Sequence, residues 1–142
     1  MRRSANGADR RGPKAASLVV SRAPDLVSLV QRSCAPSWSV EARDDWSRIE
    51  KATGGPNVGI VVLDDDVVPE KERSGLIANL HAWFPHAMII YVAGKHDASV
   101  ERMARAGGVL SYTSKPVDVA RLESLLRGLS HRRLESSPTI RD

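Results

Sequence analysis

The sequence lacks the residues that build disulfide frameworks, membrane spans or secretory signals. Its 142 residues include a single cysteine, Cys34, which excludes an internal disulfide and is typical of a reducing cytoplasm. The apolar runs are far shorter than the roughly 20 residues that a membrane-spanning helix needs. Residues 4–14 are polar, so the apolar core of a secretory signal is missing. These absences predict a cytoplasmic protein without a membrane segment.

Signatures of catalysis are also missing. The chain has four histidines, and neither they nor Cys34 show the spacing of a metal-binding cluster. There is no glycine-rich phosphate loop and no set of serine, histidine and aspartate that suggests a hydrolase. We therefore expect no catalytic residue and no enzyme activity.

The net charge of +4 comes from the ends of the chain. Residues 1–14 hold five basic side chains and one acidic side chain, whereas the body between the two ends is close to neutral. We expect 1–14 to be a disordered basic arm, 15–130 the folded domain and 131–142 a polar tail. Nucleic-acid binding through the arm is the least favoured of the functional hypotheses, because the arm has no aromatic side chains to stack on bases.

Apolar segments with the character of buried strands alternate with segments of helical periodicity. The predicted strands are 17–20, 38–42, 58–63, 87–92 and 109–113. The predicted helices are 25–34, a segment around 46–52, 75–84, a short segment around 100–104, and 119–129. Strands that alternate with helices indicate right-handed crossovers and a parallel sheet covered on both faces. The sequence therefore predicts an α/β fold, a doubly wound five-stranded parallel sheet with five strand–helix repeats.

Three carboxylates, Asp64, Asp65 and Asp66, follow the most apolar of these strands. Open α/β sheets place their binding sites outside the carboxyl ends of the strands. The same edge should therefore carry the residues that follow the other strands: Ser21, Arg22, Ala93, Lys115 and Pro116. Carboxylates facing a lysine suit Mg²⁺ and phosphate chemistry, but a simple ion pair between an aspartate and Lys115 explains the composition equally well.

This arrangement resembles the receiver domain of two-component response regulators over residues 15–129, which implies a flavodoxin-like receiver fold. The family ends its third strand in a phosphoacceptor aspartate followed by a loop with proline, as in Leu63-Asp64-Asp65-Asp66-Val67-Val68-Pro69. The family's Gly-x-x-x-Tyr-x-x-Lys-Pro run is matched by 108–116. The resemblance implies a cis bond before Pro116. The end of the strand selects Asp64 as the phosphoacceptor position, whereas counting back from the proline selects Asp65.

Three positions depart from the family pattern. The family's first strand ends in an acidic pair that binds Mg²⁺ together with the phosphoacceptor, and these positions are Ser21 and Arg22 here. The family's Thr or Ser at the end of the fourth strand is Ala93, which has no hydroxyl to bind a phosphoryl group. Tyr112 still matches the switch aromatic. These departures indicate a degenerate pseudo-receiver in which Arg22 and Lys115 pair with the aspartates, Arg22 replacing the metal.

We therefore favour a phosphorylation-independent protein-interaction module of a two-component or phosphorelay pathway. No metal site and no cofactor are expected. The alternative is a working receiver that a histidine kinase phosphorylates on Asp64 or Asp65, with Mg²⁺ bound by Asp64, Asp65 and Asp66. The resemblance implies protein partners that bind the face formed by the fourth helix, fifth strand and fifth helix, with a homodimer through this face as one option. Exposed residues expected there are Arg102, Arg105, Tyr112, Asp118 and Arg121.

Overall fold

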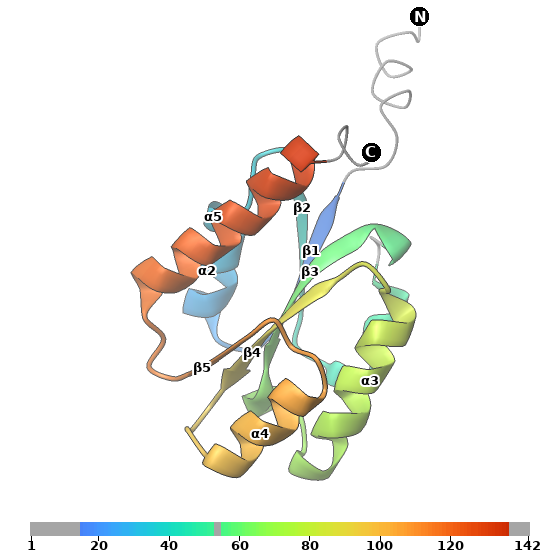
Figure 1. The fold of residues 1–142 in the computed structure, drawn as a ribbon, viewed down its shortest axis with the longest axis vertical. Coiled ribbons are helices and arrows are strands. Elements are labelled where there is room, and N and C mark those ends of the chain that lie inside the picture. The colour runs from blue at the N-terminus through green and yellow to red at the C-terminus, as the bar shows by residue number, and fades with distance from the viewer. Residues whose placement is uncertain (1–14, 53–54, 137–142) are drawn as a thin grey trace, which may run out of the picture.

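The computed structural model describes residues 15–52 and 55–136 and contains one parallel sheet (Figure 1). Its five strands lie in the order β2-β1-β3-β4-β5. The strands are β1 (Ala16–Val20), β2 (Ser39–Arg43), β3 (Val58–Asp64), β4 (Met88–Ala93) and β5 (Ser111–Ser114). The helices are α2 (Pro24–Ser33), α3 (Arg73–Trp83), α4 (Ala98–Ala106) and α5 (Val119–Ser136). The predicted doubly wound α/β fold is confirmed.

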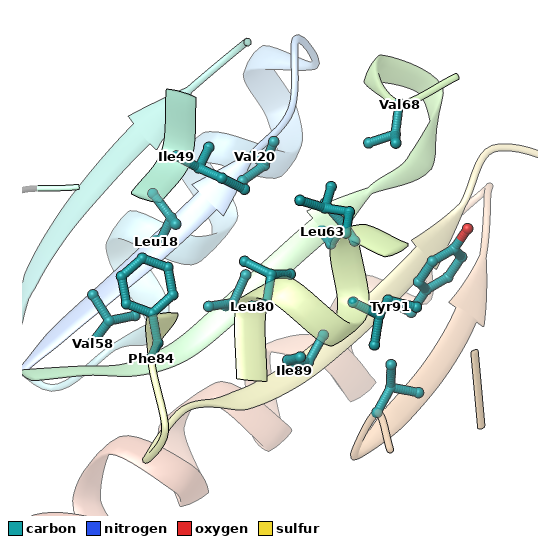
Figure 2. Packing of buried hydrophobic residues seen from close by; sticks show 14 of the residues in the cluster. Leu18, Val20, Ile49, Val58, Leu63, Val68, Leu80, Phe84, Ile89 and Tyr91 are labelled. Carbon is teal, nitrogen blue, oxygen red and sulfur yellow. The ribbon is translucent and has the colours of Figure 1, made fainter. Parts of the chain in front are cut away.

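The helices cover both faces of the sheet. Helices α2 and α5 lie on one side, and α3 and α4 lie on the other (Figure 1). Strand β3 is buried along its whole length because its side chains alternate between the two layers. Ile60 and Val62 pack with the α2 and α5 residues, whereas Val61 and Leu63 pack with those of α3 and α4. Figure 2 shows part of the second layer, in which Leu80 of α3 lies close to strand residues.

The segment between β2 and β3 differs from the prediction. We expected an α-helix around 46–52, but residues Trp46–Lys51 form a 3₁₀ helix in which Arg48 has non-helical dihedral angles (φ −128°, ψ 23°). Arg43 of β2 donates hydrogen bonds to the carbonyl groups of Arg48 and Lys51, each at 3.4 Å. These carbonyl groups are thus satisfied by a strand side chain instead of by the amide groups of a continuing helix.

The C-terminal boundary also differs from the prediction. Helix α5 continues to Ser136, past the expected domain end at residue 130 and into the segment expected to be a polar tail. Ser130 is fully buried, donates to the Leu126 carbonyl at 2.9 Å, and accepts from the Ala35 amide at 2.9 Å. It thus joins α5 to the end of α2 directly after Leu129. The predicted arm, 1–14, and residues 137–142 of the tail lie outside the described residues. Within the described part of the chain, no helix has the length and apolarity to cross a bilayer.

Replacing Leu126 by alanine should lower the free energy of unfolding by about 2–5 kcal/mol. Leu126 is fully buried between the sheet and α2, so the substitution leaves a cavity. Val119→Ala on the same helix is the matched control; Val119 is 48% exposed, and its loss should cost no more than about 0.5 kcal/mol. Urea unfolding followed by circular dichroism measures both, and equal losses would contradict this packing.

Candidate functional site

The three aspartates lie where β3 leaves the sheet, and they diverge because the chain turns there. β3 ends at Asp64, and residues Asp65–Val67 form one turn of 3₁₀ helix. The Asp64 side chain caps this turn by accepting from the Asp66 amide at 3.0 Å. The turn buries Asp64 and Asp65, at 1% and 4% exposure, and leaves Asp66 exposed. The three carboxylates therefore have different surroundings.

Asp64 is held by donors that directly follow the first and fifth strands. Its Oδ2 accepts from the Ser21 hydroxyl at 2.6 Å and from the Lys115 ammonium at 2.8 Å. Ser21 in turn accepts from the Ala23 amide at 2.9 Å, which leaves its proton for Asp64. Lys115 also pairs with Asp66 at 2.8 Å. Burial lowers the pKa of Lys115, but the hydrogen bonds to Asp64 and Asp66 outweigh it and raise that pKa above its ordinary value.

Asp65 is held by a second set of donors. Its Oδ2 accepts from the Tyr91 hydroxyl at 2.7 Å, and its Oδ1 accepts from the Gly94 amide at 2.8 Å. Arg73 Nη1 lies 3.6 Å from Asp65 Oδ2 and supplies the opposite charge. Arg73 is fixed by hydrogen bonds to the carbonyl groups of Val68 and Asp65, each at 3.1 Å. Both buried carboxylates are thus neutralised by their own cations, as burial of a charge requires.

Asp66 lies on the exposed side of the site. Its side chain keeps 57% of its exposure and packs over the backbone at Gly94. A side chain at position 94 would place its Cβ 2.0 Å from Asp66 Oδ1. Position 94 must therefore be glycine while Asp66 keeps this orientation.

Two tyrosines connect Asp65 to the outer edge of the sheet. Tyr91 is fully buried on β4 (Figure 2), and burial followed by the bond to Asp65 raises its pKa well above the ordinary value. Its ring stacks on Tyr112 of β5, with 5.8 Å between centroids and 13° between planes. The Tyr112 hydroxyl lies 3.2 Å from His96 Nδ1. Tyr112 is therefore positioned by a chain of contacts that begins at Asp65.

The expected ion pair between Arg22 and the aspartates is not formed. Ser21 points into the site and Arg22 is exposed, because successive side chains of an extended chain point to opposite sides. In the described part of the chain, no ion pair joins Arg22 to any of the three aspartates. Arg22 instead lines a groove of about 510 Å³ with Asp66, Trp46 and the acidic pair Asp44 and Asp45. The cation beside the buried carboxylate of Asp65 is Arg73.

The other predicted positions lie at the expected edge. Ala93 ends β4, is fully buried, and offers no hydroxyl to the site. Its carbonyl accepts from the Lys115 amide at 2.9 Å, which brings Lys115 up to Asp64. The peptide bond between Lys115 and Pro116 is cis.

No model of a known protein family matches the sequence, and no curated protein sequence matches it. Solved structures do match. A response regulator from Thermotoga maritima has a TM-score of 0.69 at 14% identity, covering 83% of this chain and 98% of that one. The signal receiver domain of an HD domain-containing protein from Pseudomonas fluorescens has a TM-score of 0.68 at 20% identity, covering 86% and 98%. A CheY-like receiver domain protein from Methanospirillum hungatei gives 0.64 at 19% identity, covering 86% and 98%.

The chain has the receiver-domain fold. The aspartate at the end of β3 and the lysine after β5, the positions that the resemblance picked out, meet across the edge of this fold at 2.8 Å. Asp64, which ends the strand and contacts Lys115, holds the position that strand packing assigned to the phosphoacceptor. Asp65, which the spacing to Pro69 assigned, contacts Arg73 and Tyr91 instead.

The carboxylates of this receiver fold already have partners among the described side chains. One oxygen of each aspartate can lie within 4.8 Å of the others, a spacing that a metal could bridge. The Lys115 ammonium, however, already bridges Asp64 and Asp66 at 2.8 Å each, and Asp65 accepts from Tyr91 and Gly94. A dication would have to displace this ammonium, and Ser21 adds no carboxylate to help it. Metal binding by these carboxylates would therefore require Lys115 to move.

Sequence reasoning missed Arg73 and Tyr91. Arg73 begins α3, eight residues after Asp65, and nothing in its spacing marks it as a partner of a strand end. Tyr91 could have been identified from the sequence, because it is the one hydroxyl-bearing side chain in the predicted strand 87–92. A buried tyrosine hydroxyl normally has a hydrogen-bond partner, and the neighbouring strand ended in carboxylates.

Asp65→Ala should lower the free energy of unfolding by about 3–5 kcal/mol, because it leaves Arg73 without its counter-charge and the Tyr91 hydroxyl without its acceptor. Asp66→Ala is the matched control, with an expected loss of at most about 1 kcal/mol for an exposed ion pair. Urea unfolding measures both. A loss at Asp65 no larger than at Asp66 would contradict the buried network.

The stability of the fold should decrease at alkaline pH through Tyr91. The raised pKa of Tyr91 favours the neutral phenol in the folded state, so its contribution is complete below the ordinary tyrosine pKa of about 10 and is lost as the pH rises above it. This side chain should contribute a slope of up to about −1.4 kcal/mol per pH unit to the free energy of unfolding. Tyr91→Phe should remove that slope, whereas Tyr112→Phe, which retains Tyr91, should keep it. Equal slopes in Tyr91→Phe and Tyr112→Phe would contradict the assignment of this pH dependence to Tyr91.

Proposed function

We propose that this chain is an atypical receiver-like signalling domain that works through protein interaction without being phosphorylated. The observation that supports this most directly is the state of Asp64. Its carboxylate is 1% exposed, one oxygen accepts from Ser21 and Lys115, and the other accepts from the Asp66 amide. A nucleophilic oxygen must approach a phosphoryl group at about 3–3.5 Å. On this proposal Asp64 does not make that approach, because its carboxylate is buried and both of its oxygens already accept hydrogen bonds.

The charge balance of the site supports the same proposal. Two cations, Lys115 and Arg73, are set against three carboxylates, so most of the negative charge is neutralised by side chains. Phosphoryl transfer relies on groups that stabilise charge developing on the phosphoryl oxygens. Ala93 offers no hydroxyl for this purpose, and Ser21 offers no carboxylate for a metal. On this proposal the domain needs neither Mg²⁺ nor another cofactor.

The proposed interaction surface is the face formed by α4, β5 and α5. Four of its charged residues, Arg102, Arg105, Asp118 and Arg121, are exposed. Tyr112 lies between the two helices, partly exposed and held by its stacking on Tyr91. A surface aromatic that is already fixed loses little conformational entropy on binding, which favours recognition of a protein. We propose that partners of a two-component pathway bind here.

Mg²⁺ with beryllofluoride, or with acetyl phosphate, should leave the protein unchanged. The readouts are the amide NMR signals of Gly94 and Asp66 and the fluorescence of Trp46, which lines the groove beside Asp66. We expect no Mg²⁺-dependent shift, because the oxygens of Asp64 and Asp65 are already bound. A saturable shift that needs both Mg²⁺ and beryllofluoride would establish the phosphoacceptor alternative instead.

Ser21→Asp should create the missing metal site. The new carboxylate would lie beside Asp64, where the hydroxyl now lies at 2.6 Å, and two adjacent carboxylates gain from a shared dication. Mg²⁺ should therefore raise the melting temperature of Ser21→Asp and not that of the native chain. Ser28→Asp, the same substitution at an exposed position of α2, is the matched control, and Arg22→Asp tests the neighbouring position. Equal responses in Ser21→Asp and Ser28→Asp would show that position 21 does not control metal binding.

A further inference from the structure

The outer edge of β5 is open. β5 is the last strand in the order β2-β1-β3-β4-β5, so among the residues that the structure describes only β4 pairs with it. Figure 1 shows it at the margin of the sheet, between α4 and α5. A groove of about 470 Å³ follows this edge, lined by Ser111, Tyr112 and Thr113 on one side and by α5 residues, including Arg121 and Leu125, on the other. An open strand edge offers unpaired amide and carbonyl groups to another extended chain.

Exposed apolar side chains precede and follow β5 in the chain. Among the described residues, two large hydrophobic side chains are exposed, Leu110 and Val119, each at 48%. Leu110 directly precedes β5, and Val119 begins the helix that follows it. Single exposed apolar residues are ordinary, but both of these flank one strand of about 13 Å. Their placement fits a partner that extends along the strand and contacts an apolar residue at each end.

The charges beside the groove are mainly positive. Arg121 lines it, and the Arg105 guanidinium lies 6.0 Å from the centre of the Tyr112 ring. Asp118 also lines the groove, where its carboxylate accepts from the Arg121 backbone amide at 3.1 Å, and Glu101 pairs with Arg105. In the described part of the chain, neither Arg121 nor the exposed Arg102 forms an ion pair with a carboxylate.

These charges distinguish between two occupants. A second copy that paired through the same edge would bring a surface with Arg102 and Arg121 against an identical surface, since a two-fold interface joins the same patch of both subunits. Like charges that meet in an interface are unfavourable. A segment rich in Asp or Glu would meet the same arginines with opposite charge.

We propose that the β5 edge binds an extended acidic segment of a partner protein, which adds to the sheet as a sixth strand and directs carboxylates toward Arg121 and Arg102. The apolar side chains of that segment contact Leu110 and Val119. The inference rests on the proposed interaction function and adds to it the chemistry of the partner and the way in which it binds.

The test uses the full chain and a short fluorescent peptide of alternating valine and glutamate, with a valine–lysine peptide of equal length as its counterpart. Fluorescence anisotropy should show saturable binding of the glutamate peptide alone. Arg121→Glu should weaken that binding by about tenfold or more, which corresponds to about 1.4 kcal/mol. Arg127→Glu is the matched control, since Arg127 is exposed on the same helix and does not line the groove; it should leave the affinity unchanged.

Strand addition has its own readout. Amide hydrogen exchange of residues 110–114 should slow when the glutamate peptide binds, because edge amides gain acceptors. Binding without this protection, binding of both peptides alike, or absence of binding would overturn the inference. A dimer in sedimentation that Arg121→Glu disrupts would establish the second copy as the occupant instead.

The two proposals fail separately. If the glutamate peptide binds only when Mg²⁺ and beryllofluoride are present, the phosphorylation-independent function is wrong, while the assignment of the β5 edge stands. If the peptide fails to bind with or without them, the β5 inference is wrong, while the state of Asp64 is unaffected.

Discussion

The fold depends on the neutralisation of two carboxylates that are buried at the end of its central strand. Asp64 and Asp65 are adjacent in the chain and almost fully removed from water. Burying an ionised carboxylate costs several kcal/mol unless a cation and hydrogen-bond donors replace the lost water. Those groups come from elements far apart in the sequence: Lys115 follows β5, and Arg73 begins α3. The two ion pairs therefore join β3 to the far edge of the sheet and to the α3 layer.

The same constraint reaches the surface through Tyr91. This hydroxyl is one of the donors to Asp65, so its ring must lie where the hydrogen bond requires. The ring then forms one side of the stack with Tyr112. Tyr112 in turn meets His96 and the Arg105 guanidinium. The acidic site is thus connected to the exposed face by a packed series of groups. The positions of Asp65 and Tyr91 therefore restrict the position of Tyr112.

The sequence predicted the parts of this arrangement that depend on local pattern. The apolar run before Asp64 identifies a central strand, and the run that ends in Lys115 and Pro116 identifies the opposite side of the site. Arg22 was placed wrongly, because side-chain alternation after β1 directs its neighbour Ser21 inward. The segment around 46–52 is a 3₁₀ helix instead of the expected α-helix, and Arg43 satisfies two of its carbonyl groups from outside. Arg73 could not be identified as a partner of Asp65 from the sequence. The residues between Asp65 and α3 have no regular periodicity from which its position could be extrapolated.

A receiver that switches needs two states whose free energies differ by no more than a few kcal/mol. In this chain, freeing Asp64 would separate a buried carboxylate from Lys115, and freeing Asp65 would separate one from Arg73. Breaking a buried pair costs about 3–5 kcal/mol. At 1.4 kcal/mol for each factor of ten, even one broken pair would hold the alternative state below about one per cent of the population. On the proposed function, a protein partner at the β5 edge would bind the prevalent conformation, and neither ion pair would have to separate.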